Sequence, residues 1–178
     1  MKKLSKYMSL LLRHKPEQGN LILDPRGFVH IDDLLAALNK HPHHPIVRSD
    51  LEELTKPSND PNVKTRFEIE GDYIRAGHGH SVPISGYEEI IPTADLYHAT
   101  PAENVSIILT TGLKSMNRDK VHLSYDKEIT VEAARRRSKS IVLIKIERAA
   151  GIRFYKSADK RIILSDDIPP EYLSQEIV

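Results

Sequence analysis

Apolar residues recur every three or four positions near the start of the chain, with polar residues between them. This spacing predicts an amphipathic helix from about Lys3 to Arg13. The residues of its apolar face are Leu4, Met8, Leu11 and Leu12. Pro16 follows, and because proline cannot continue a helix, Arg13 and His14 fall at the helix C-terminus. Basic residues there can simply complement the helix dipole, so a structural interpretation stands beside a functional one.

The same pattern predicts several short elements before residue 77. They are a strand at 21–23, a turn at 24–27, a helix that Asp32 caps, a helix that begins at Ser49 or Asp50, and a hairpin of strands at 65–69 and 73–76. The order helix, strand, helix, helix, hairpin is typical of a winged-helix module. Such modules often bind nucleic acid, although a fold alone does not establish a function.

Three histidines lie between two prolines after the second predicted helix: His41, His43 and His44. Their number suggests a metal site, but the prolines hold this segment extended. We interpret the segment as a solvated loop.

The second half of the chain shows a different pattern. Proline and glycine residues predict a linker over residues 82–94. Beyond it the sequence predicts strands at 95–99, 121–123 and 140–146 and near 153–155 and 161–164, helices at 101–109 and 129–137, a helix C-cap at Gly112, and a turn at 169–170. The chain is therefore predicted to be an α+β protein, with an N-terminal winged-helix-like lobe at 1–81 and a C-terminal mixed α/β lobe at 95–178.

Charge and composition narrow the classes of function. The 178 residues include 26 Lys and Arg and 25 Asp and Glu, so any surface that binds nucleic acid has to be local. The absence of cysteine excludes disulfides and thiolate chemistry and is typical of a reducing compartment. The sequence shows neither a signal-peptide pattern nor an apolar run of transmembrane length. We expect a soluble, cytoplasmic monomer that does not contact membranes.

The richest candidate chemistry follows the predicted strand at 73–76, in the loop Gly77-His78-Gly79-His80-Ser81. Arg75 offers a rigid guanidinium fork, glycines allow close approach of a ligand, and imidazoles add donors. These are the groups that a phosphate needs. Two other interpretations remain open: a surface turn with incidental histidines, and a metal site at His78 and His80, which lacks a completing cysteine or acidic residue.

Other polar groups mark the second lobe. Two predicted strands end with a histidine near a hydroxyl residue, His98 with Thr100 and His122 with Ser124. They resemble the walls of a ligand cleft, but half-buried structural histidines would give the same pattern. The run Arg135–Arg137 cannot point one way on a helix, and a solvated basic helix end explains it equally. No Rossmann or Walker sequence is present, so an NAD site here would not be of the Rossmann type.

Several of these stretches together carry a resemblance. They are Leu10–Pro16, Arg66-Phe67, Ile74-Arg75-Ala76 with Gly79-His80-Ser81, Leu96–Thr100, Gly112-Leu113, Met116, Arg118, Val121–Ser124, Phe154–Ser157, and Pro169-Pro170 with Tyr172-Leu173. In combination they resemble the signatures of the NAD-dependent RNA 2′-phosphotransferases, which act in the final step of fungal-type tRNA splicing. The resemblance runs nearly from end to end.

The resemblance implies a fold and a reaction. It implies an N-terminal winged-helix-like lobe for a tRNA-like RNA and a C-terminal ADP-ribosyltransferase-like lobe for NAD, with NAD as co-substrate and no metal. An internal RNA 2′-phosphate attacks C1″ of the nicotinamide ribose and expels nicotinamide. The ribose 2″-OH then attacks the bridging phosphate, which yields 2′-OH RNA and ADP-ribose 1″,2″-cyclic phosphate. Because the nucleophile is already an anion, cationic positioning groups matter more than a strong base.

Site residues follow from the resemblance position by position. The catalytic residues that it implies are Arg13, His14, Arg75 and Arg136. The cofactor-binding residues are Gly79, His80, Ser81, His98, Ala99, Thr100, His122 and Ser124. This chain departs from the family pattern at Ala134 and Ser138, where glycines usually flank the fourth arginine, so a shift by one arginine is an alternative. It also departs at His78, Lys120 and Ala99, where glutamine, histidine and glycine are usual.

Two rival functions remain at this stage. One is a nucleic-acid-binding protein whose second lobe has lost its chemistry, against which the presence of all four candidate catalytic residues argues. The other is ADP-ribosylation of a different phosphate end, on RNA, DNA or a small molecule, that stops after the first step.

Overall fold

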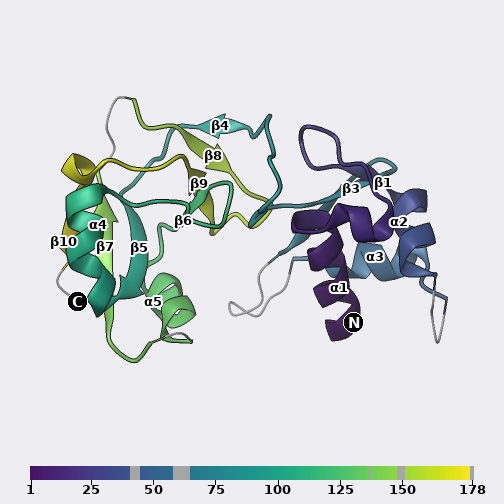
Figure 1. The fold of residues 1–178 in the computed structure, drawn as a ribbon, viewed down its shortest axis with the longest axis horizontal. Coiled ribbons are helices and arrows are strands. Elements are labelled where there is room, and N and C mark those ends of the chain that lie inside the picture. The colour runs from purple at the N-terminus through teal and green to yellow at the C-terminus, as the bar shows by residue number, and fades with distance from the viewer. Residues whose placement is uncertain (41–44, 58–64, 137, 148–150, 177–178) are drawn as a thin grey trace. The chain divides into compact units, whose positions relative to one another are not determined.

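A computed structural model describes residues 1–40, 45–57, 65–136, 138–147 and 151–176 (Figure 1). The chain divides into two compact units, Met1–Tyr87 and Glu88–Val178. Each unit has its own cluster of buried apolar side chains. None of the helices in these ranges is long and apolar enough to cross a membrane. The predicted α+β class is confirmed, because the helices accompany antiparallel sheets.

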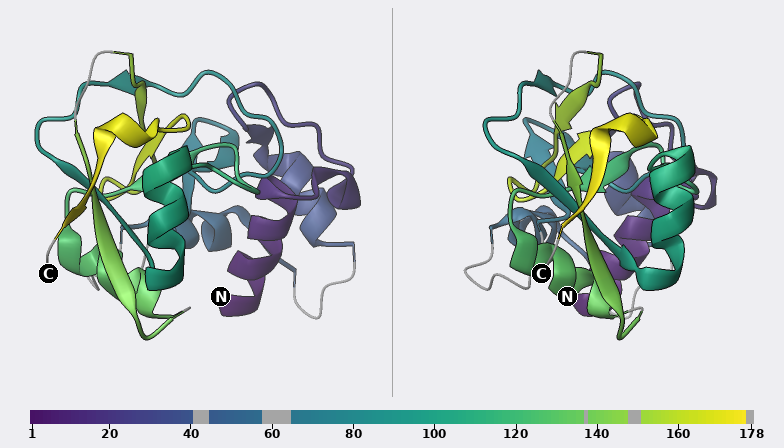
Figure 2. Two further views of the ribbon diagram at one scale, coloured as in Figure 1. Left: turned by 60° about the vertical axis from the view of Figure 1, so that its left-hand side comes forward. Right: turned by 90° about the vertical axis from the view of Figure 1, so that its left-hand side faces the viewer.

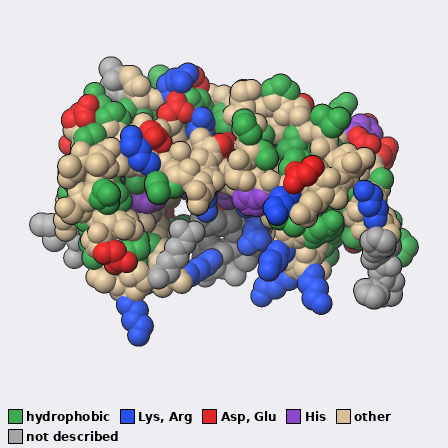
Figure 3. All heavy atoms as spheres, in the orientation of Figure 1, with side chains coloured by type: hydrophobic (Ala, Val, Ile, Leu, Met, Phe, Trp, Pro, Cys, Tyr) green, Lys and Arg blue, Asp and Glu red, His purple; other side chains and the backbone are tan. Residues whose placement is uncertain are grey.

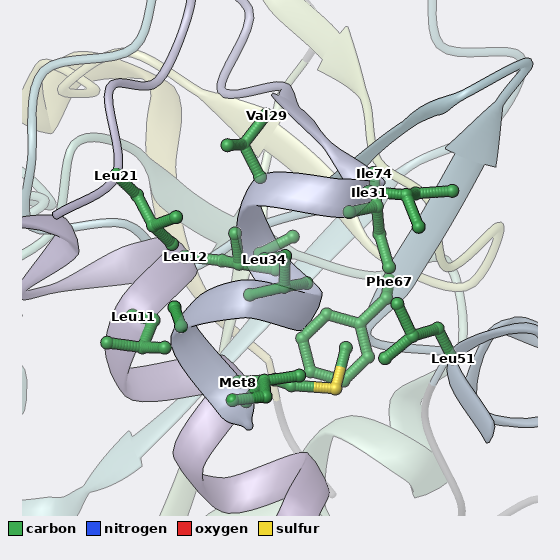
Figure 4. Packing of buried hydrophobic residues seen from close by; sticks show 13 residues of the cluster. Met8, Leu11, Leu12, Leu21, Val29, Ile31, Leu34, Leu51, Phe67 and Ile74 are labelled. Carbon is green, nitrogen blue, oxygen red and sulfur yellow. The ribbon is translucent and has the colours of Figure 1, made fainter. Parts of the chain in front are cut away.

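The first unit combines three α-helices with a small antiparallel sheet (Figures 1 and 2). Its elements are α1 (Lys2–Arg13), the 3-10 helix η1 (Pro16–Gly19), β1 (Val29–His30), α2 (Ile31–Leu38), α3 (Arg48–Thr55), β2 (Phe67–Glu70) and β3 (Tyr73–Ala76). The strand order is β1-β3-β2. The predicted apolar face of the first helix is confirmed, since Met8, Leu11 and Leu12 are fully buried. Side chains from all three helices and from β2 and β3 meet in this core (Figure 4).

Two predictions for this unit are wrong in detail, and a third concerns residues that the structure does not describe. The strand at 21–23 is wrong: the backbone N–H of Leu21 donates to the Pro16 carbonyl at 3.0 Å, and the strand of the sheet is β1 instead. The cap of α2 is His30, whose Nδ1 accepts from the backbone N–H of Asp32 at 3.3 Å, so Asp32 belongs to the first turn. The histidine-rich segment at 41–44 lies outside the described residues.

The second unit contains two antiparallel sheets, of order β10-β7-β5 and β4-β8-β9-β6. Its elements are β4 (Glu89–Ile90), β5 (Leu96–Pro101), η2 (Ala102–Asn104), α4 (Val105–Thr111), β6 (Val121–Leu123), α5 (Lys127–Arg135), β7 (Ile141–Ile146), β8 (Phe154–Lys156), β9 (Ile163–Ser165), η3 (Pro170–Tyr172) and β10 (Leu173–Glu176). Helix α5 packs on β5 and β7. A bridge between Tyr97 and Ser124 joins β5 to the residue after β6.

The structure differs from the predicted elements of this unit in several places. Where the sequence predicts one helix at 101–109, Pro101 ends β5, η2 follows, and α4 runs from Val105 to Thr111. Residues 82–94 include β4, which pairs with β8, so this segment is not entirely without regular structure. Helix α5 begins earlier than predicted, because the Asp126 carboxylate accepts from the backbone N–H of Ile129 at 2.9 Å and caps it. Strand β10 was not predicted, since its sequence Leu-Ser-Gln-Glu carries little apolar signal and it forms by pairing with β7.

Gly112 ends α4 in a conformation that only glycine adopts readily, with φ +91°. A Cβ there would lie 2.4 Å from the carbonyl oxygen of Ile168, which accepts the backbone N–H of Leu113.

We therefore expect Gly112→Ala to lower the free energy of unfolding by roughly 3 kcal/mol, measured by urea denaturation. Gly71→Ala is the matched control: φ is +60° but no atom lies within 4 Å of the new Cβ, so a loss of about 1 kcal/mol is expected. Equal losses would contradict the steric account.

Candidate functional site

The first group of candidate residues lies where the end of α1 meets the loop after β3. The backbone N–H of Ser81 donates to the Arg13 carbonyl at 2.9 Å, and that of Val82 reaches the same carbonyl at 3.3 Å. The Nδ1 atom of His14 lies 2.9 Å from the Ser81 hydroxyl. Residues 67 positions apart in the sequence are thus joined directly. Arg13 and His14, predicted as catalytic, therefore lie directly beside Ser81, which was predicted with Gly79 and His80 to bind the cofactor.

The guanidinium of Arg75 is held on three sides. Arg75 stands opposite Glu68 in the β2–β3 hairpin, and its Nε donates to the Glu68 carboxylate. One terminal nitrogen donates to the Arg26 carbonyl at 3.0 Å. The ring of Phe28 lies beneath the group, with its centroid 4.5 Å from the guanidinium carbon. These contacts determine the orientation of Arg75 before any ligand binds, and neither Glu68 nor Phe28 was predicted as part of the site.

Arg13 is positioned by the neighbouring strand. One terminal nitrogen donates to the Arg66 carbonyl at 3.3 Å, and the guanidinium carbon lies 5.9 Å from the ring centroid of buried Phe67. The Arg66 carbonyl also accepts the backbone N–H of Gly77, at the start of the loop. The same peptide group therefore holds both the catalytic candidate on α1 and the glycine-rich loop.

His80 occupies the interior of this group. Its side chain is only 1% exposed, its Nδ1 lies 3.2 Å from the Tyr87 hydroxyl, and its Nε2 has no hydrogen-bond partner among the described residues. Burial lowers the pKa of His80 to about 4, and the positive charges of Arg13, Arg75 and His14 act in the same direction. His80 is therefore a neutral imidazole at physiological pH, close to three cationic or titratable groups that favour an anion.

The depressed pKa of His80 has a measurable consequence. Between pH 6.5 and 4 the unfolded chain binds a proton at His80 and the folded chain does not, so stability falls as the pH is lowered through this window. We expect a contribution of up to roughly 3 kcal/mol. Urea unfolding of the wild type and of His80→Gln at pH 7 and pH 4.5 measures it. The variant should lose less stability on acidification, and an identical pH dependence in the two proteins would contradict the burial argument.

The alternative of a metal site at His78 and His80 gains no further ligand among the described residues. Both histidines are buried, and no group of three or more His, Asp or Glu side chains that could hold a metal ion occurs within the part of the chain that the structure describes. Gly79 between them has φ +80°, a conformation that explains the glycine.

The second group of candidate residues lies between β5 and β6. The backbones of Tyr97 and Ser124 exchange hydrogen bonds of 2.8 and 3.1 Å. The Nδ1 of His98 lies 3.0 Å from the His122 carbonyl, and a terminal nitrogen of Arg118 lies 3.0 Å from the Nδ1 of His122. The two predicted strand ends are thus neighbours, as the sequence implied. Arg118, four residues before His122, completes the group, although its position in the site was not predicted.

These contacts assign the tautomers of both histidines. A carbonyl only accepts, so His98 carries its proton on Nδ1, and in the neutral ring Nε2 is an acceptor. A guanidinium only donates, so Nδ1 of His122 is the acceptor and a neutral ring carries its proton on Nε2. The tautomer and the orientation of each ring are therefore set by a backbone carbonyl for His98 and by a guanidinium for His122.

The other candidates of the second unit have varied surroundings. Thr100 and Ser124 are buried, and the Ser124 hydroxyl accepts the backbone N–H of Asp126 at 3.1 Å, ahead of α5. Ala99 lies within β5, opposite Leu143. Arg136 directly follows α5 and is exposed. Its participation in a site with Arg13, His14 and Arg75 stays a prediction.

Comparisons with known proteins agree on one family. A family model described as RNA 2′-phosphotransferase, Tpt1 / KptA family, matches residues 1–167. A Thermococcus kodakarensis protein named "Probable RNA 2′-phosphotransferase" is 39% identical over 178 residues, 97% of this chain and 96% of the relative. Proteins of the same name from Trichormus variabilis and Pyrococcus furiosus are 38% and 37% identical, over 96% and 97% of this chain and 94% of each relative.

Proposed function

Because the chain belongs to the RNA 2′-phosphotransferase, Tpt1 / KptA family and is therefore a transferase, we propose that it transfers an internal RNA 2′-phosphate to NAD. The products are 2′-OH RNA, nicotinamide and ADP-ribose 1″,2″-cyclic phosphate, by way of RNA joined through its 2′-phosphate to ADP-ribose. The observation that supports this most directly is the cationic group of the first unit. Arg13, His14 and Arg75 lie about a loop rich in glycine, and Arg75 is already oriented for a ligand.

The charges of this group fit a phosphate that is itself the nucleophile. A phosphate monoester is an anion at neutral pH, so the protein needs to position it rather than deprotonate it. A guanidinium fork binds two phosphate oxygens at once, and the His14 ring, held by the Ser81 hydroxyl, adds a donor beside it. The neutral His80 ring is buried beside these groups and adds no charge to them.

For the second substrate we propose the group between β5 and β6. NAD supplies the electrophilic ribose carbon and the nicotinamide leaving group. His98 and His122 bring polar rings of fixed orientation to this group, and Arg118 brings a cation of the kind that an NAD pyrophosphate requires. We interpret the second unit as ADP-ribosyltransferase-like on this basis. The first unit is interpreted as winged-helix-like because of its element order and its β1-β3-β2 sheet.

The test is product analysis with an RNA oligonucleotide that carries one internal 2′-phosphate, with and without NAD, and in EDTA. We expect nicotinamide release, loss of the 2′-phosphate and formation of the cyclic phosphate, with no effect of EDTA. Phosphate removal without NAD, or loss of activity in EDTA that a divalent ion restores, would overturn the proposal. Accumulation of ADP-ribosylated RNA alone would indicate a transferase that stops after the first step, and RNA binding without nicotinamide release would indicate an inactive protein.

A further inference from the structure

Helix α1 concentrates positive charge on a chain that is nearly neutral. Its twelve residues include four cations, Lys2, Lys3, Lys6 and Arg13, and no acidic residue, whereas the net charge of the whole chain is +1. The three lysines are exposed. In the view of Figure 3, blue side chains gather where α1 lies in Figure 1, with no red side chain among them.

Many other cations of the described ranges are paired with carboxylates. Examples are Arg26 with Glu70 at 3.2 Å, Arg48 with Asp72 at 2.6 Å, Lys120 with Asp166 at 2.8 Å and Arg161 with Asp159 at 2.8 Å. Lys2, Lys3 and Lys6 make no ion pair with any described residue. The positive charge of these three lysines is therefore not compensated by a carboxylate of the described residues.

The geometry of the helix arranges this charge along a line. Lys2, Lys6 and Arg13 fall within about 40° of one another around the axis, at about 100° per residue. They span about 16 Å at about 1.5 Å per residue. Arg66, also exposed, adds a cation beside them, with a terminal nitrogen 3.5 Å from the Ser5 hydroxyl. We call Lys2, Lys3, Lys6 and Arg66 the α1 basic face; it runs towards Arg13 and His14.

We propose that the α1 basic face binds backbone phosphates of the substrate RNA on one side of the 2′-phosphate. The inference rests on the proposed function, because it takes Arg13 and His14 to hold the 2′-phosphate. A single strand carries one phosphate per about 3.4 Å when stacked, so the distance from Arg13 to Lys2 corresponds to about five nucleotides. A membrane surface does not fit, because Met8, Leu11 and Leu12 of α1 are fully buried in the core and cannot enter a bilayer.

The test compares RNA length in a variant with neutral side chains, Lys2→Gln, Lys3→Gln and Lys6→Gln combined. Glutamine keeps the helix propensity of lysine. The substrates are a decanucleotide with a central 2′-phosphate and a dinucleotide that is too short to reach Lys6. We expect kcat/KM of the variant to fall at least tenfold for the decanucleotide and less than twofold for the dinucleotide. Fluorescence anisotropy should show the salt dependence of decanucleotide binding reduced by about 2 in logarithmic slope.

The control removes the same charge elsewhere, by Lys56→Gln, Lys114→Gln and Lys156→Gln, all exposed and ion-paired. This variant should bind the decanucleotide with the wild-type salt slope. Three results would overturn the proposal. They are an equal loss of kcat/KM for both substrate lengths, a control variant that binds the decanucleotide as weakly as the α1 variant does, and a salt slope of the α1 variant equal to that of the wild type. Binding is measured without NAD and so does not depend on turnover. If the lysine substitutions lower the salt slope of binding but the wild type turns over no substrate, the proposed function is refuted and RNA binding by the α1 basic face is retained.

Discussion

Replacing Arg75 with lysine is expected to lower kcat/KM for a 2′-phosphorylated RNA by about ten- to a hundredfold, although the charge is retained. In Arg75 the Nε–H donates to Glu68 and one terminal nitrogen donates to the Arg26 carbonyl, which leaves the second terminal nitrogen for a phosphate. Lysine has a single nitrogen and cannot make these three contacts at once. The loss of one charge-assisted hydrogen bond is worth about 1.5–3 kcal/mol. Each 1.36 kcal/mol is about a tenfold change in rate.

Arg26 is a close control for Arg75. It also lies over the Phe28 ring, 5.0 Å from the centroid, and it pairs with a carboxylate, Glu70, but both partners are about half exposed or more. Arg26→Lys should leave kcat/KM within about twofold, since only its backbone carbonyl takes part in the site. If Arg26→Lys were as damaging as Arg75→Lys, the loss would reflect packing on Phe28 and not a phosphate contact.

Glu68 provides a second check on the same arrangement. Glu68→Gln keeps an acceptor for Arg75 but removes the charge that fixes its orientation, so a smaller loss than in Arg75→Lys is expected, mainly in kcat. Glu70→Gln on the same strand, paired with exposed Arg26, should have no effect. The hairpin turn could have revealed Glu68 from the sequence, because pairing Glu70 with Tyr73 places Glu68 opposite Arg75.

How far the sequence predicts the fold depends on where the stabilising contacts lie. Helix α1 was predicted within one residue at its start, because its apolar spacing is a local signal. The hairpin and the Gly112 cap were predicted for the same reason, since a turn or a cap needs only its own residues. Strands β1 and β10 were not, because two or four residues become a strand only by pairing with a distant partner, β3 or β7.

The candidate site shows the same division. The motifs name Arg13, His14 and Ser81, but only the fold shows that the Arg13 carbonyl accepts the backbone N–H groups of Ser81 and Val82, 68 and 69 residues later. Likewise, the histidines of β5 and β6 were named from the sequence, whereas their tautomers depend on the His122 carbonyl and on Arg118. The sequence gives the type of each residue directly, whereas the direction in which each donor points depends on how the backbone folds.

The remaining large effect concerns Arg136, which we propose acts on the second chemical step. In that step the phosphate is esterified on both sides, and negative charge grows on its equatorial oxygens as the 2″-OH attacks. A guanidinium at those oxygens is most valuable there. Arg136→Ala is therefore expected to slow the second step by about ten- to a hundredfold and to accumulate RNA joined through its 2′-phosphate to ADP-ribose. Gel analysis of a labelled oligonucleotide over time measures this species.

The structure supplies a matched control one residue away. Arg135 is the last residue of α5 and Arg136 its C-cap, with φ −65° and ψ −17°, and both side chains are exposed. Consecutive residues near a helix end point in directions about 100° apart. A phosphate that one of these arginines contacts therefore lies away from the side chain of the other. Arg135→Ala should then turn over without accumulating the intermediate. If Arg135→Ala accumulates it and Arg136→Ala does not, the second-step arginine is one position earlier than the resemblance implies.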